Sequence, residues 1–104
     1  MAKISKEIKA DILIGGEVAS FVLRRPTNQE INEFEAERNR EIIEKAKTST
    51  ARGELFDRIL TNVIDLEDEA GAITVERKDA IPANLKSNII LLKIENEFRF
   101  DVKN

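Results

Sequence analysis

The sequence predicts an α+β fold with an N-terminal β-hairpin followed by about three helices, and it leaves open a short strand at the C-terminus. Three observations support this prediction. Residues 7–24 alternate between apolar and polar side chains around two glycines, residues 27–47 open with a helix-capping sequence, and residues 53–65 carry apolar side chains at helical spacing.

Composition limits the domain count and the class of protein. Apolar residues make up 41% of the 104-residue chain, enough for one modest core, so we expect residues 1–104 to form a single domain. The net charge of −3 argues against nucleic-acid binding through phosphate neutralisation. The chain has no cysteine and no apolar run long enough to span a membrane, so a soluble cytoplasmic protein without disulfides is the expectation.

The hairpin is predicted over residues 7–24. Gly15 and Gly16 can adopt the positive φ values of a tight turn, and the segments on both sides alternate in hydrophobicity. In the first segment one face is expected to carry Ile8, Ala10, Ile12 and Ile14, and in the second segment Ala19, Phe21 and Leu23 share a face. A helical start before the turn is the alternative, because Ile4, Ile8 and Ile12 also lie four residues apart.

A helix is predicted over residues 27–47. Pro26 pushes Arg25 into an extended conformation, and Thr27 and Glu30 have the spacing of a capping box. Its apolar stripe is thin, with two cations whose stems can cover apolar surface. The stripe contains Ile31, Phe34, Arg38, Ile42, Lys45 and Ala46.

A second helix is predicted over residues 53–65, after a break at the small polar residues 48–53. Its apolar spacing marks it as the best core candidate. The residues concerned are Leu55, Phe56, Ile59, Leu60, Val63 and Ile64. The acidic segment that follows carries a brief alternation at Ile73 and Val75, which indicates either a short strand or an extended surface loop.

A third helix is predicted over residues 82–95, because Pro82 suits a first helical turn and Leu85, Ile89 and Leu92 follow at helical spacing. The alternative is a hairpin that turns at residues 95–96. Residues 89–94 are rich in β-formers, and Phe98, Phe100 and Val102 alternate.

The reactive side chains of most enzymes are missing, since the chain has no histidine or cysteine. The acidic segment also fails as a calcium loop, because Ala70 stands where an EF-hand needs glycine.

Arg24 and Arg25 are consecutive in an extended segment and point to opposite sides, so they cannot act as one clamp. We expect one to cover the hairpin edge and the other to pair with helix carboxylates such as Glu30; an anion site at the helix start is the alternative. No enzyme activity, metal or cofactor is expected.

The C-terminal stretch has more apolar residues than one core-facing stripe requires. They are Ile89, Ile90, Leu91, Leu92, Ile94, Phe98, Phe100 and Val102. Either this helix is buried in the fold, or one of its faces binds a protein. The candidate partner-binding residues are Leu91, Ile94 and Phe98, together with Arg24 and Arg25.

Two sequence steps resemble those of the tail assembly chaperone family of long-tailed bacteriophages and prophages. The first is Leu23-Arg24-Arg25-Pro26-Thr27, and the second is Ile81-Pro82 followed by Leu85-Lys86. The resemblance implies a non-enzymatic protein in the cytoplasm of the bacterial host. It implies as partners the tape measure protein and the tail tube protein, and self-association into a homo-oligomer; the family has no defined active-site residues to carry over.

Two other functions remain open from the sequence. One is a small regulatory or nucleic-acid-binding module that uses a basic patch of Arg24, Arg25, Arg38 and Arg40. The other is a structural component of the virion.

Overall fold

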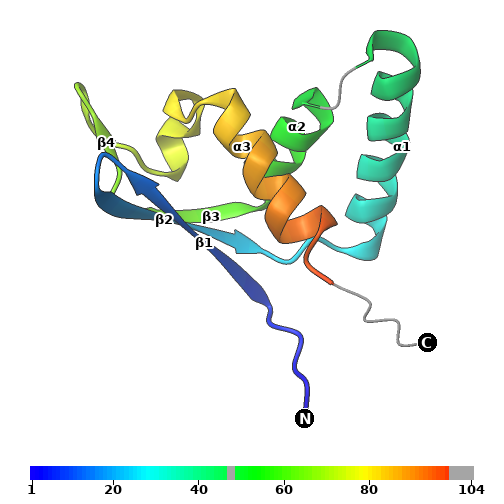
Figure 1. Ribbon diagram of the computed structural model, residues 1–104, viewed down its shortest axis with the longest axis horizontal. Coiled ribbons are helices and arrows are strands. Elements are labelled where there is room, and N and C mark those ends of the chain that lie inside the picture. Colours follow the sequence, from blue (N-terminus) through cyan, green and yellow to red (C-terminus); the bar gives the residue numbers. More distant parts are fainter. Residues whose placement is uncertain (47–48, 99–104) are drawn as a thin grey trace.

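An antiparallel β-hairpin leads into helices that cover one side of it (Figure 1). The structure, a computed structural model, describes residues 1–46 and 49–98. In chain order its elements are β1 (Glu7–Ile14), β2 (Glu17–Arg24), α1 (Asn28–Lys45), α2 (Ser49–Ile59), β3 (Leu60–Ile64), β4 (Glu67–Asp68), β5 (Gly71–Ala72), the 3₁₀ helix η1 (Val75–Ala80), α3 (Ala83–Ile90) and the π-type turn η2 (Leu91–Glu95). The α+β prediction is confirmed.

The predicted hairpin is confirmed with its bounds. Gly15 and Gly16 have φ values of 57° and 83°, which suit a two-residue turn that joins strongly twisted strands. The pairing sets Ile8 opposite Leu23 and Ala10 opposite Phe21. These four side chains are buried beneath the helices, whereas the exposed Ile14 lies near the turn at the rim of the core.

Helix α1 begins where the sequence predicts. The Thr27 hydroxyl accepts a hydrogen bond from the Glu30 amide at 3.1 Å, and the Glu30 carboxylate accepts one from the Thr27 amide at 3.0 Å, which completes the capping box. The helix ends at Lys45, and residue 47 of the predicted helix lies outside the described residues.

The predicted apolar stripe of α1 is wrong in its second half. Ile42 is 49% exposed, while the neighbouring Glu41 is 1% exposed. The Glu41 carboxylate accepts a hydrogen bond from the Ala51 amide in the first turn of α2. Helix α1 packs against α2 and lies to one side of the sheet, so the side chain that caps the neighbouring helix is buried instead of the isoleucine.

The second predicted helix is correct only in its first part. Helix α2 already begins at Ser49, within the predicted break, and ends at Ile59, and residues 60–64 form strand β3. β3 pairs with β2 in the sheet order β1-β2-β3, with a bulge at Val22 and Leu23. Helical spacing of apolar residues misled the prediction here, because a free edge of β2 gives this β-branched segment backbone partners that a helix lacks.

Residues 65–80 form a small hairpin and a 3₁₀ helix, so neither alternative predicted around Ile73 and Val75 is correct in detail. Strands β4 and β5 pair only over two residues each. The Arg77 side chain closes this hairpin with bonds to the Asp68 carboxylate at 2.7 Å and the Ala72 carbonyl at 2.9 Å. The acidic loop is therefore closed by an arginine.

The third predicted helix is confirmed over residues 83–95, with its last turn widened in η2. The alternative hairpin turning at residues 95–96 is wrong, because Leu91–Glu95 is helical. Phe98 lies in a bend, and the rest of the expected C-terminal strand lies outside the described residues.

One cluster of buried side chains joins the sheet to α2 and α3. The Phe21 and Phe56 rings meet edge to face at 5.9 Å between centroids. Between α2 and α3, the buried Lys86 ammonium lies 2.7 Å from the Asp57 carboxylate, so the lysine is paired where it leaves water. Helix α1 adds only Phe34 to this core.

Thr61→Ala tests whether residues 60–64 form a strand. The Thr61 hydroxyl donates to the Val22 carbonyl at 3.0 Å, so we expect its loss to lower the free energy of unfolding by about 1 kcal/mol. In a helix the same change would raise that free energy by roughly 0.5 kcal/mol. Urea unfolding followed by circular dichroism gives the sign, and a stabilised variant would contradict the strand.

Candidate protein-binding site

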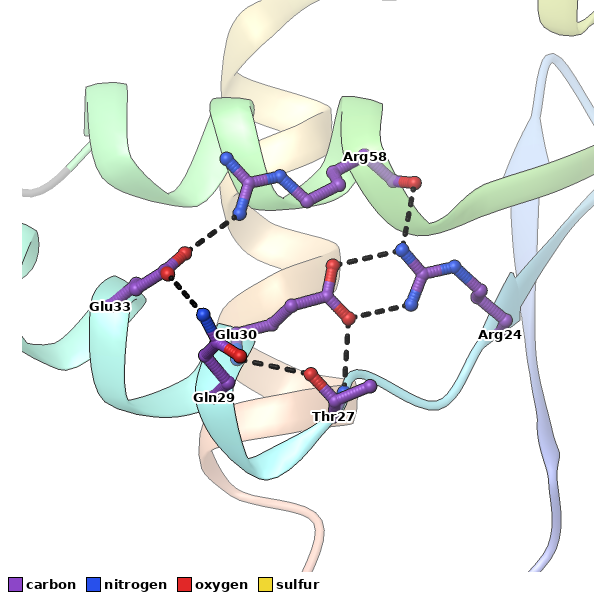
Figure 2. A network of polar contacts seen from close by, with 6 residues as sticks. All are labelled: Arg24, Thr27, Gln29, Glu30, Glu33 and Arg58. Atoms are coloured by element: carbon purple, nitrogen blue, oxygen red, sulfur yellow. Dashed lines mark hydrogen bonds and ion pairs between the residues drawn. The ribbon is translucent and has the colours of Figure 1, made fainter.

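The two consecutive arginines end in separate ion pairs on opposite sides of the chain. Arg24 forms a bidentate pair with Glu30, at 2.7 and 2.8 Å, and reaches the Arg58 carbonyl at 3.4 Å (Figure 2). Glu30 therefore serves both the capping box and the Arg24 pair. One arginine does pair with Glu30, as the sequence predicts.

These hydrogen bonds change the acidity of Glu30. The Arg24 guanidinium, and after it the Thr27 amide, lower the pKa of the Glu30 carboxyl from 4.5 to about 2. Each bond favours the charged form of the carboxylate. The strand–helix junction is thus fixed by a group that stays ionised well into acid.

Arg25 fastens the C-terminal segment to the N-terminus. Its guanidinium pairs with both carboxylate oxygens of Glu97 at 2.7 Å, and its Nε donates to the Ser5 carbonyl at 2.7 Å. The guanidinium carbon also lies 5.6 Å from the centre of the Phe98 ring, within the range of a cation–π contact. Arg25 therefore positions the segment that carries Phe98.

Glu95 fixes the other side of the same segment. Its carboxylate accepts hydrogen bonds from Arg52 of α2 at 2.6 Å and from Arg38 of α1 at 2.8 Å. Burial raises the pKa of the Glu95 carboxyl, but the bonds from Arg52 and Arg38 outweigh burial, and the net direction is downward. Charge-assisted bonds of this kind are stronger than neutral ones.

The predicted basic patch consists of paired arginines. Arg24, Arg25 and Arg38 pair as described, and Arg40 pairs with Glu37 and Glu44 along α1. Each of the four guanidiniums thus already contacts a carboxylate, which reduces the positive field they could present to a phosphate.

An apolar groove of about 330 Å³ lies between the start of α1 and the C-terminal segment. Its exposed apolar side chains are those of Ile4, at 70%, and Phe98, at 57%. The paired residues Arg25 and Glu97 also line it. Its lining consists of Ile4, Arg25, Pro26, Asn28, Ile31, Ile94, Glu97 and Phe98.

The groove brings together Arg25, Ile94 and Phe98 of the five candidate residues. Ile94 lines the groove, is half-buried and packs against the core. Leu91 is half-buried and does not line the groove, and Arg24 lies in the Glu30 network. Sequence reasoning missed Ile4, Pro26 and Ile31. Arg25 bonds to both Ser5 and Glu97, and this tertiary contact brings Ile4 beside Phe98.

A second recess, of about 420 Å³, lies between β1 and η2. Leu92, 63% exposed, and the edge residues Ile8 and Lys9 line it. Ile4, Arg25, Glu97 and Phe98 line both the recess and the groove, so the two hollows adjoin. The N-terminal segment and residues 92–98 therefore carry a continuous uneven surface with several exposed apolar side chains.

The structure shows no metal site or membrane-spanning helix over residues 1–46 and 49–98. No group of three or more acidic side chains there could hold a metal ion, and no helix there is both long and apolar enough to cross a bilayer. Comparisons of the chain with family models, curated proteins and solved structures give no match.

Glu30→Gln tests the junction through its pH dependence. Because the folded pKa lies below the ordinary value, the Glu30 carboxylate stabilises the fold above pH 4.5, and this contribution is lost as the pH falls towards about 2. We therefore expect the gap in unfolding free energy between wild type and Glu30→Gln to narrow over this interval.

Urea unfolding at a series of pH values measures that gap. Glu35→Gln is the matched control, since Glu35 is exposed on the same helix and forms no ion pair within the described part of the chain. A gap that stays constant from neutral pH to about pH 2 would contradict the assigned role of Glu30.

Proposed function

We propose that this chain is a non-enzymatic protein-binding protein of the tail assembly chaperone type, acting in the cytoplasm of a bacterial host. The groove at Ile4, Ile31 and Phe98 would hold apolar side chains of a helix in the tape measure protein. The observation that supports this proposal is an exposed apolar groove whose wall is held in place by ion pairs. A holdase for apolar helices needs such a surface and no chemistry of its own.

The geometry favours a helical occupant over an extended one. The groove is walled by two side chains from loops, Pro26 and Phe98, and by Ile31 of α1, and it has no strand edge along its length. Apolar anchors spaced three or four residues apart on a helix can enter such a hollow without needing backbone hydrogen bonds from it. A long helical partner offers such anchors repeatedly.

The two sequence steps behind the resemblance have structural roles. Pro26 and Thr27 turn the chain from β2 into α1, and Pro82 starts α3. The first step also supplies Arg25 and Pro26 to the groove. Its proposed contribution to function is thus to shape the binding surface, while Arg24 stabilises the corner behind it.

Nucleic-acid binding has weaker support than protein binding. The four arginines that the module would use are each engaged with carboxylates. The chain's net charge of −3 adds a repulsive field at low salt. We therefore place the contact with a partner on apolar side chains.

Phe98→Asp should abolish partner capture without loss of the fold. The Phe98 ring is more than half exposed, so its loss costs the monomer little. Burial of such a ring by a partner contributes roughly 2 kcal/mol, and a charge there adds a desolvation cost. We expect at least tenfold weaker binding to a tape measure fragment encoded in the same genome, measured by pull-down and calorimetry.

Ile43→Asp is the matched control, because Ile43 is 83% exposed at the far end of α1. It should leave capture unchanged, and circular dichroism should be unchanged for both variants. Equal losses for both variants would show nonspecific adhesion, and full capture by a folded Phe98→Asp protein would reject the groove as the binding site.

A further inference from the structure

Strand β1 lies at an edge of the sheet and leaves one row of backbone groups open. The sheet order is β1-β2-β3, so within residues 1–46 and 49–98 β1 pairs on one side only. The Arg25 amide donates to the Lys6 carbonyl at 2.9 Å, next to the pair Glu7–Arg24. Even-numbered residues of β1 therefore face β2, and odd-numbered residues direct their amides and carbonyls to the free edge.

The open part of this edge runs from Lys9 to Leu13. At its start the Ser5 hydroxyl donates to the Glu7 carbonyl at 2.7 Å and accepts from the Glu7 amide at 3.3 Å. The backbone groups of Glu7 therefore already have a hydrogen-bond partner. Lys9, Asp11 and Leu13 are all exposed. An uncovered edge of this kind is a template for another strand.

We propose that a second copy of the chain pairs with this edge, β1 against β1, antiparallel and about a two-fold axis at Ala10. This register sets Lys9 opposite Asp11 of the second copy, and by symmetry Asp11 opposite its Lys9. Opposite charges then face each other directly on the solvent side. The two pairs also use the free amides and carbonyls of Lys9 and Asp11.

Other registers are disfavoured by side-chain direction or by charge. A shift by one residue would place the core-facing residues of one copy beside the solvent-facing residues of the other. A two-fold axis at Lys9 sets two lysines together, and one at Asp11 sets two aspartates together. A two-fold axis at Ile8 would set Lys9 opposite Glu7, whose amide and carbonyl the Ser5 hydroxyl already binds. Charged residues at a sheet edge guard against indiscriminate pairing, and among these registers the one at Ala10 pairs opposite charges through free backbone groups.

The recess between β1 and η2 gives this second copy a place to bury apolar side chains. In the proposed register, Ile12 of the second copy lies opposite Ile8, on the helix-covered side of the sheet. Its Ile14 lies opposite Lys6, beside the recess that Ile8 and the exposed Leu92 line. Ile14 is 43% exposed in the single chain, so burying it would lower the free energy of the dimer.

The assembly joins two sheets into one continuous sheet, with the helices of both copies on the same side. It can be tested apart from the proposed function, because Lys9 and Asp11, which set the register, do not line the groove at Ile31 and Phe98. Partner capture and self-association can therefore fail separately.

Lys9→Pro tests the edge, because proline removes an amide that faces outward and leaves the bonds to β2 intact. Sedimentation of wild type over a concentration series should show dimers, and Lys9→Pro should be monomeric with an unchanged circular dichroism spectrum. Lys3→Pro, outside the strand, is the control and should still dimerise. A wild type that remains monomeric up to about 1 mM, or a folded Lys9→Pro dimer, overturns the proposal.

A charge reversal tests the register. It also tests whether β1 pairs with β1 at all, in case Lys9→Pro does not fold. Lys9→Glu and Asp11→Lys each turn two attractive pairs into repulsive ones, so each should weaken the dimer about tenfold or more. The double variant restores opposite charges and should recover most of the affinity. Single variants that dimerise as wild type does, or a double variant as weak as the singles, overturn this register.

Discussion

The structure depends on arginine–carboxylate pairs that hold the segment after α3, as far as residue 98, against the rest of the fold. Arg25 binds Glu97, and Arg38 and Arg52 share Glu95, so the segment after α3 is fixed to the β2–α1 corner and to both preceding helices. Hydrogen bonds between charged groups are stronger than neutral ones, and a bidentate arginine–carboxylate pair also fixes the relative orientation of the two groups. The groove exists because this segment stands beside Pro26 and Ile31 and does not collapse onto the core.

The same reliance on charge explains why helix α1 has only a narrow apolar stripe. It places one large apolar side chain, Phe34, in the core and buries Glu41 against the first turn of α2. The amides at the start of a helix lack partners within the helix and carry partial positive charge, so a carboxylate there offsets part of its own desolvation. Apart from Phe34 and the half-buried Ile31, α1 is attached through capping and ion pairs, which leaves Ile42 and Ile43 in solvent.

The groove and the open edge of β1 are two separate surfaces that suit different partners. The groove offers apolar side chains without backbone partners, which suits a helix. The edge offers backbone partners with a charge pattern complementary to itself, which suits a second copy. Both lie near the N-terminal segment, because the recess that adjoins the groove is lined by Ile4 and Ser5, which precede β1, and by Glu7, Ile8 and Lys9 of β1.

The sequence by itself determined the local elements whose signals lie within a few residues. The Gly15-Gly16 turn, the capping box at Thr27 and Glu30, and the start of the last helix near Pro82 were all predictable, since turn and cap geometry depends on neighbouring residues. Tertiary structure decided the rest. Residues 60–64 became a strand because β2 had a free edge, Glu41 was buried because α2 begins beside it, and Ile4 met Phe98 because Arg25 ties the two ends together. In each case the deciding partner lies far away in the chain, where no periodicity can report it.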